Sequence, residues 1–254
     1  MKFASWNVNG LRSIYRKGLF EVVFGNDPDI ATLQEIKSSE SDLSPDIKDV
    51  LGYHSFFFPA EKKGYSGVAI YSKLEPTAIE KGIGYDRFDK EGRAIFLEFP
   101  GFFFGGLYMP HGGRQKENLD YKMTSYDSLM KYVSGLKGKP VIIAGDMNIA
   151  HKPIDLARPK ENADNICFTP GEREKFGELI SMGFADTFRE KDDSPGKYTW
   201  WSYMSGVRDR NIGWRLDYVL SLSEPASIKD VAIRSDIKGS DHAPISADID
   251  VDVV

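Results

Sequence analysis

The 254-residue sequence contains a single cysteine, Cys167, which excludes an internal disulfide and any zinc site built from several cysteines. A nucleophilic role for Cys167 competes with the much commoner use of a lone thiol as a small apolar side chain. No apolar run approaches the roughly 20 residues that a membrane-spanning helix needs. The first residues, MKFASWNV, lack the charged and then apolar pattern of a secretory signal. We therefore expect a soluble, cytoplasmic protein that does not act at a membrane.

Two common catalytic motifs are also missing. The sequence has no Gly-x-x-x-x-Gly-Lys phosphate loop, which leaves nucleotide-triphosphate motor chemistry unsupported. It has no Gly-x-Ser-x-Gly motif either, which weakens the hypothesis of a serine hydrolase. The formal net charge of −5 argues against a nucleic-acid partner. Net charge is a weak guide for an enzyme with a metal ion and local basic patches, so charge leaves the partner undecided.

The chain has no repeat, low-complexity tract or linker-like stretch, which predicts one domain over residues 1–254. The opening reads as β-α-β, with strands at 2–8 and 29–35 around an amphipathic helix from Leu11 to Phe24. Two further helices are expected over 115–136 and from Thr169-Pro170 to about Met182, the latter with a threonine cap and a glutamate three residues later. Apolar runs bounded by turn residues predict further strands at 53–59, 67–73, 94–100, 102–109, 140–148, 214–222, 230–235 and 242–250. Strands that outnumber the helices inserted between them predict an α/β sandwich, with two packed sheets and helices outside.

Several of these strands end abruptly at a carboxylate, amide or imidazole. The residues concerned are Asn7 and Asn9, Glu35, Asp146 and Asn148, Asp217, and Asp241 with His242. One such ending is unremarkable, but five indicate strand ends that converge on one rim, where ligands bind in layered α/β folds. Carboxylates and amides without cysteine partners suit Mg²⁺ or Mn²⁺ rather than zinc. With a histidine held by an aspartate, the set describes metal-assisted phosphoester hydrolysis.

The ordered motifs of the chain resemble those of the exonuclease III family, the abasic-site endonucleases within the endonuclease–exonuclease–phosphatase superfamily. The matching segments are SWNVNGLR (5–12), LQEIK (33–37), GYSGVAIYSK (64–73), LYMP (107–110), GDMNIAH (145–151), IDLARPKEN (154–162), YTWWSY (198–203), GWRLDY (213–218) and GSDHAPI (239–245). The short SWN, QE, GDMN and SDH motifs indicate only the superfamily. IDLARPKEN and the stretch from YTWWSY through GWRLDY narrow the resemblance to this branch, and the matches cover essentially the whole chain.

The resemblance implies a four-layered α/β sandwich that cleaves duplex DNA on the 5′ side of an abasic site with Mg²⁺, for which Mn²⁺ can substitute. A 3′→5′ exonuclease or 3′-end-cleaning activity is expected at the same site, in a monomer without an obligate protein partner. Glu35 would be the principal metal ligand, assisted by Asn7, Asn9 and Asp241. The implied catalytic residues are Asp146, which positions or deprotonates the attacking water, Asn148, which holds a phosphate oxygen, Tyr108, which binds phosphate or stabilises charge, and His242, oriented by Asp217.

The resemblance also implies a substrate pocket. Trp200, Trp214 and Leu216 fall where the family encloses the flipped, baseless sugar, in a pocket too tight for an intact nucleotide. The other implied DNA contacts are Asn162 and Asn165 near that pocket, Arg114 and Met204 as wedges in the opened duplex, and Tyr65 and Lys37 at the backbone. From composition alone, core positions are the commoner explanation for the tryptophans, and turn positions are the commoner one for Asn7 and Asn9.

Two positions depart from the family pattern. His111 stands where relatives often carry asparagine or glutamine, and Trp200 stands where some carry phenylalanine. Two alternative functions are compatible with the same fold. A phosphatase of lipid or inositol phosphates would share the metal chemistry but would have no use for the Trp200 and Trp214 pocket. A catalytically dead DNA-binding module would be expected to lack a core residue, and none is missing.

In GSDHAPI, Asp241 and His242 are neighbours in sequence. Adjacent side chains of a strand point to opposite faces, so we expect these two to diverge. His242 would then pair with Asp217, while Asp241 turns toward the metal side.

Overall fold

The computed structural model describes residues 1–222 and 227–252, whose strands form two six-stranded sheets. The first sheet has the order β11-β12-β1-β2-β4-β3, with β1 (Lys2–Asn7), β2 (Ile30–Gln34), β3 (His54–Phe58), β4 (Val68–Ser72), β11 (Ile228–Ile233) and β12 (Ile245–Ile249). The second has the order β5-β6-β7-β8-β10-β9, with β5 (Ala78–Lys81), β6 (Ala94–Glu98), β7 (Phe103–Tyr108), β8 (Val141–Asp146), β9 (Ala185–Asp186) and β10 (Asp217–Leu222). Each sheet has one parallel pair, β1 with β2 and β7 with β8, among antiparallel neighbours. Both sheets are therefore mixed.

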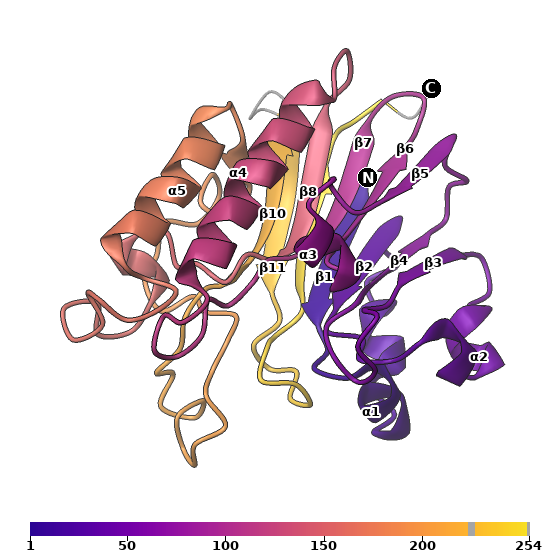
Figure 1. Ribbon diagram of the computed structural model, residues 1–254. Helices are drawn as coiled ribbons and strands as arrows, with labels where there is room; N and C mark the ends of the chain where they lie inside the picture. Colours follow the sequence, from indigo (N-terminus) through magenta and orange to yellow (C-terminus); the bar gives the residue numbers. More distant parts are fainter. Residues whose placement is uncertain (223–226, 253–254) are drawn as a thin grey trace.

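Helices cover the outer faces of the two packed sheets, which confirms the predicted α/β sandwich. Helices α4 (Leu119–Gly135) and α5 (Pro170–Ser181) lie side by side over β8 and β10 (Figure 1). On the other sheet lie α1 (Leu11–Arg16) and the 3-10 turn η1 (Phe20–Val23), with α2 (Pro45–Lys48) near by. The remaining short elements are α3 (Asp86–Lys90) and the 3-10 turns η2 (Glu40–Asp42) and η3 (Pro153–Asp155). None of the helices in the described residues is long and apolar enough to cross a membrane.

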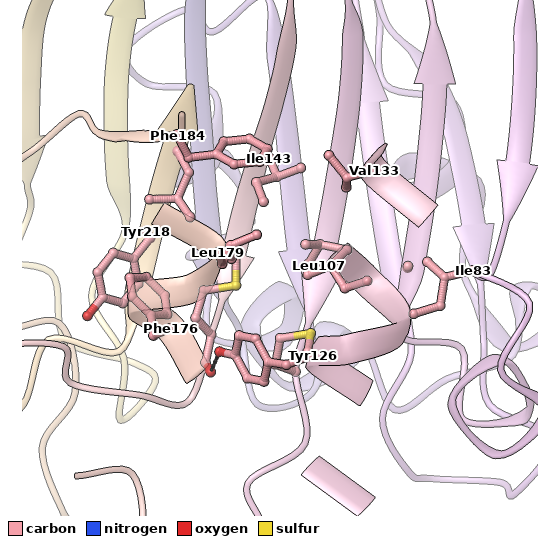
Figure 2. Packing of buried hydrophobic residues seen from close by; sticks show 14 of the residues in the cluster. Ile83, Leu107, Tyr126, Val133, Ile143, Phe176, Leu179, Phe184 and Tyr218 are labelled. Atoms are coloured by element: carbon pink, nitrogen blue, oxygen red, sulfur yellow. Dashed lines mark hydrogen bonds between the residues drawn. The ribbon is translucent and has the colours of Figure 1, made fainter. Parts of the chain in front are cut away.

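Side chains of β8 alternate between two apolar cores. Ile143 packs with the helix side, whereas Ile142 and Ala144 pack between the two sheets. This explains the continuous apolar run of this strand, since both of its faces are buried. Figure 2 shows the helix side, where Phe176 of α5 packs on Tyr218 of β10 with ring centroids 4.8 Å apart. The strand is thus fixed from both sides, and its last residues are held rigidly at the rim.

The predicted start of α5 is confirmed at atomic detail. The Thr169 hydroxyl accepts from the Glu172 amide at 3.3 Å, and the Glu172 carboxylate accepts from the Thr169 amide at 3.0 Å. This reciprocal capping satisfies two backbone donors that the first helical turn leaves free.

The predicted helix from Leu11 to Phe24 is wrong in its extent. Helix α1 ends at Arg16, and a 3-10 turn resumes at Phe20. Between them, Gly18 has a φ of 68°, a left-handed conformation that glycine adopts without strain and that ends a helix. The helix-like spacing of apolar residues continues from α1 into η1 because both elements pack on the same sheet. Strand β5 was not predicted, and all four of its residues are exposed.

A buried ion network holds the loops beside β10. The Arg215 guanidinium, which is fully buried, donates to Asp155 Oδ1 at 2.8 Å and to Asp186 Oδ1 at 3.0 Å. Arg189 donates to the same Asp155 oxygen at 2.8 Å. Burial of charge is tolerated when it is paired and hydrogen-bonded. The network therefore ties η3 to the segment that leads into Asp217.

Candidate active site

The polar strand ends meet at one edge of the two sheets, as predicted from the sequence. Asn7 is the last residue of β1, Tyr108 of β7 and Asp146 of β8. Asp217, the first residue of the antiparallel strand β10, lies opposite Asp146. Because β1 and β8 belong to different sheets, the rim lies where the two sheets pack together.

The Asn7 amide joins two carboxylates of this rim. Its Nδ2 donates to Glu35 Oε1 and to Asp146 Oδ2, both at 2.9 Å. One ligand atom from each of Glu35, Asp146 and His242 lies within 4.8 Å of the others. The carboxylates of Glu35 and Asp146 supply the hard oxygen atoms that suit a divalent cation such as Mg²⁺. This cluster is the candidate metal centre.

Lys37 controls the charge of Glu35. Burial alone would raise the pKa of Glu35, but the Lys37 ammonium, 2.7 Å from Oε2, and the hydrogen bond from Asn7 hold that pKa below its ordinary value. Lys37 Nζ also donates to Asn9 Oδ1. Glu35 is therefore an anion at neutral pH. The sequence suggested a DNA contact for Lys37, and its contacts here are with the two rim residues.

Asp146 is held by three donors and is almost fully buried. Its Oδ1 accepts from the Asn148 amide at 2.9 Å, and its Oδ2 accepts from Asn7 and, at 3.3 Å, from Asn148 Nδ2. Burial raises the pKa of Asp146 to about 7 against the opposing charge of His242. Asn148 Nδ2 also donates to the Met109 carbonyl at 2.8 Å. The carboxylate is thus fixed in place and has a basicity suited to accepting a proton near neutral pH.

His242 and Asp217 are hydrogen-bonded, as expected from the sequence. The distance from His242 Nδ1 to Asp217 Oδ2 is 2.8 Å, and Nε2 lies 3.7 Å from Asp146 Oδ2. Burial lowers the pKa of His242, but the charges of Asp217 and Asp146 outweigh it and raise that pKa to about 10. The Thr199 hydroxyl accepts from the amides of Leu216 and Asp217 at 2.9 and 3.1 Å, which fixes the start of β10. The imidazole is therefore oriented and protonated at neutral pH.

Asp241 points away from His242, which confirms the predicted divergence. Its Oδ1 accepts from Asn9 at 2.9 Å and from the Tyr203 hydroxyl at 3.3 Å, while its Oδ2 accepts from the Trp200 indole at 3.1 Å. Among the described residues, the cluster of Glu35, Asp146 and His242 does not include this carboxylate. Asp241 instead connects the rim to the aromatic side of the site.

Tyr108 lies against a buried arginine. The Arg93 guanidinium stacks 4.5 Å from the centre of the Tyr108 ring, and its Nη1 donates to the Tyr108 carbonyl at 3.0 Å. Its Nη2 donates to the Tyr65 hydroxyl at 3.1 Å. Burial and the nearby Glu35 charge keep the pKa of Tyr108 well above its ordinary value, so the phenol is a neutral donor. Arg93 carries no sequence motif, and its role was not predicted.

The predicted pocket residues share one apolar cluster. Leu216 is buried in it, and Trp200 and Trp214 pack against it partly exposed. Its other members, which the sequence did not suggest, are Ala150, Leu156, Ile166, Cys167 and Phe168. The Phe168 ring meets Trp214 edge-on, with centroids 6.3 Å apart. An aromatic-walled cluster therefore lies beside Asp241 and the rim.

The predicted wedge residues are exposed. Met204 has 73% of its surface exposed, and Arg114 is also exposed in the loop between β7 and α4. Asn162 and Asn165 bond to each other at 2.7 Å in the loop before α5. Tyr203, next to Met204, is 70% exposed and bonds Asn9 at 3.1 Å. Its place in the motif YTWWSY could have suggested it.

Four residues of the rim have left-handed backbone. Asn9, Glu35, Lys37 and Asn148 have φ values of 46°, 53°, 50° and 52°. Non-glycine residues rarely adopt this region, and such residues gather at functional sites. The turn at Glu35 lets the chain leave β2 while its carboxylate stays at the rim.

Comparison with known proteins gives a family match over residues 4–242, to the endonuclease/exonuclease/phosphatase family. The chain is 45% identical to an exodeoxyribonuclease of Bacillus subtilis, over 99% of this chain and 100% of that protein. It is 40% identical to a DNA-(apurinic or apyrimidinic site) endonuclease of Dictyostelium discoideum, over 99% of this chain and 71% of that protein.

A solved structure of similar fold is a 3′ phosphatase from Neisseria bound to a product DNA hairpin. Its TM-score is 0.90 at 27% sequence identity, with 98% of this chain and 99% of that chain covered. The similarity of fold therefore extends over nearly the whole chain.

Proposed function

Because this chain belongs to the endonuclease/exonuclease/phosphatase family, we propose that it incises duplex DNA on the 5′ side of abasic sites. It is a DNA repair nuclease of the exodeoxyribonuclease and AP endonuclease kind. The cleavage would leave a 3′-hydroxyl and a 5′-deoxyribose phosphate. Trimming of 3′ ends at the same site is part of the proposal, and the solved 3′ phosphatase of the same fold supports it. The observation that carries the proposal is the cluster of Glu35, Asp146 and His242 beside the apolar cluster that contains Trp200, Trp214 and Leu216.

The cofactor we propose is Mg²⁺, with Mn²⁺ as a substitute. Glu35 would be the principal ligand, because it stays anionic and Asn7 fixes its orientation. Asn9 and Asp241 would support the metal side through the hydrogen bond between them. When bound, the ion would neutralise charge on the phosphate that reacts.

Asp146 would accept the proton of the attacking water, since its raised pKa and buried position suit a general base. Asn148 would hold Asp146 in place. The side-chain amide of Asn148 would release its 3.3 Å hydrogen bond to Asp146 Oδ2 and donate to a phosphate oxygen instead. The protonated His242, oriented by Asp217, would donate to the phosphate, and so would the neutral phenol of Tyr108.

Trp200, Trp214 and Leu216 would enclose the flipped abasic sugar, since a tight apolar pocket rejects a nucleotide that keeps its base. Arg114 and Met204 would enter the opened duplex. Tyr65, Lys37, Asn162 and Asn165 would contact the strand and the pocket edge. A phosphatase of lipid or inositol phosphates would have no use for these aromatic residues.

We further propose that the protein is a single domain, that it is a monomer, and that it acts in the cytoplasm. These three statements rest on the sequence: no linker, no partner motif and a single cysteine.

Incubation with Mg²⁺ and a duplex carrying one tetrahydrofuran abasic analogue tests the proposed reaction. We expect a single cut 5′ to the analogue and none after addition of EDTA, because the carboxylate cluster then lacks its cation. Gel resolution of the labelled strand reads the position of the cut. Absence of any cut in Mg²⁺, or activity only on an inositol phosphate, would refute the proposal.

Trp214→Ala should lower kcat/KM for abasic incision about tenfold, because it removes one wall of the apolar pocket. Removal of a terminal 3′-phosphate should fall less, since no sugar must be enclosed there. The two rates are measured on the same duplex, with Tyr132→Phe as control, because Tyr132 lies in the last turn of α4 and packs on Phe96 of β6. Equal loss on both substrates would contradict a role confined to the pocket.

A further inference from the structure

Lys122 of α4 is a buried cation that the proposed chemistry does not use. Its side chain and that of Glu172 on α5 have no exposed surface, and the two form an ion pair. A charge in such a place needs close partners, because the interior solvates it poorly. The other hydrogen-bond partners of the Lys122 ammonium therefore indicate which parts of the structure it holds together.

The Lys122 ammonium joins three loops. It donates to the carbonyl of Asn148 at 2.6 Å and to the carbonyl of His111 at 3.3 Å, and it lies 3.7 Å from the Cys167 sulfur. These residues follow β8, follow β7 and precede α5. They are far apart in sequence, and this one group connects them.

Each of the three loops carries part of the proposed site. Asn148 fixes Asp146 through its own amide, at 2.9 Å. The loop of His111 leads to Arg114, and the loop of Cys167 continues to Phe168, which packs edge-on against Trp214.

The loops also pack closely around the lysine stem. A Cβ added at Gly112, whose φ is 91°, would lie 2.8 Å from Ile166 and 3.3 Å from Lys122 Cδ. The backbone after β7 therefore rests directly on the lysine and on the loop before α5.

Glu172 anchors the cation to the start of α5. Besides Lys122, its carboxylate accepts from the Cys167 amide at 3.0 Å and from the Thr169 hydroxyl at 2.7 Å. Because both oxygens are fixed by backbone and cap, the ammonium has a fixed position.

We propose that Lys122 is a positioning residue of the nuclease reaction, which sets the placement of the Asn148, His111 and Cys167 loops relative to one another. This inference rests on the proposed function. Without the ammonium, the Asn148 carbonyl loses its strongest partner. Asn148 is then free to shift, and because its amide is hydrogen-bonded to Asp146, the Asp146 carboxylate shifts as well.

The test compares Lys122→Met/Glu172→Gln with wild type, since the double change removes the pair without leaving one buried charge. Single-turnover incision of the tetrahydrofuran duplex is followed with enzyme in excess. We expect the rate constant to fall about 100-fold at full amplitude, as for a catalytic group displaced by about 1 Å. A merely structural role would lower the amplitude and the melting temperature but leave the rate constant unchanged.

The matched control is Lys175→Met/Asp127→Asn, which removes an ion pair between the same two helices on the exposed side, 2.8 Å in length. It should leave the rate constant unchanged. Lys122→Arg keeps a cation with several donors and should stay within about tenfold of wild type.

If the double variant does not fold, Gly112→Ala supplies the test. Its Cβ would crowd both Ile166 and Lys122 Cδ and so shift the His111 loop relative to the other two, and a tenfold or larger fall in rate constant is then expected. A wild-type rate constant in Lys122→Met/Glu172→Gln, or in Gly112→Ala if the double variant does not fold, would overturn the proposal. If wild type itself fails to cut the duplex, the proposed function has failed instead.

Discussion

Asp146→Asn is expected to lower the rate of abasic incision by about 10⁴-fold, the upper range for loss of a general base. The asparagine amide is not basic, and its NH₂ would face the donor of either Asn7 or Asn148. Single-turnover rates in Mg²⁺ measure the effect. Asp127→Asn makes the same chemical change on the exposed side of α4 and should have no effect.

The same variant should lose cleavage of every substrate in a panel of abasic, uracil-containing, 3′-phosphate, nicked and blunt duplexes. One site would then serve all activities. Residual cutting of a single substrate at the wild-type rate would argue for a second mechanism, and more than about 1% residual incision would contradict Asp146 as the proton acceptor.

Loss of His242 should lower the incision rate about 10³-fold, and Asp217→Asn should come within about tenfold of that loss. The reason is the 2.8 Å contact through which Asp217 orients the imidazole and keeps it protonated. Asp241→Asn should lower the rate only about tenfold, because Asp241 faces Asn9 and Trp200 rather than the imidazole. Rates of the three single variants, measured under one condition, provide the comparison.

Two further measurements distinguish the pairing of His242 with Asp217 from a non-specific disturbance of the folded site. His242→Ala/Asp217→Asn should be no slower than His242→Ala alone, because both changes remove one unit. In Asp217→Asn, the pKa of His242 should fall, since the carboxylate that raises it is gone. Activity that depends on the protonated imidazole would then be lost at a lower pH than in wild type. Additive losses with an unchanged pH profile would contradict the pairing.

Much of the rim could be predicted because strand ends are easy to locate. The apolar run of β8 ends at Asp146, and that of β2 ends just before Glu35. The predicted divergence of Asp241 and His242 was correct, although both residues precede β12 and His242 forms only an isolated bridge with Trp200. The strands that were not predicted lack an apolar run: β5 is exposed throughout and pairs with β6, and β9 has only two residues.

The contacts between the rim and its supports could not be predicted. The ion pair of Lys37 with Glu35 forms where both residues have left-handed backbone, and no pattern of residue types indicates that conformation. Arg93 stacks on Tyr108 from fifteen positions earlier in the chain, across the β6 and β7 pair. Lys122 has the sequence appearance of an ordinary surface residue of an amphipathic helix. Each depends on loop geometry or packing that arises only in the folded chain.

The left-handed backbone at Glu35 and Lys37 links activity to heat resistance. Asparagine tolerates this conformation, but for glutamate and lysine it costs on the order of 1 kcal/mol each. The sum of about 2 kcal/mol is a substantial part of a net stability of roughly 5–15 kcal/mol. Selection for thermal stability alone would therefore favour glycine at both positions and would dismantle the site. We therefore expect the melting temperature of this protein to be limited in part by Glu35 and Lys37, which set the charge of the candidate metal centre.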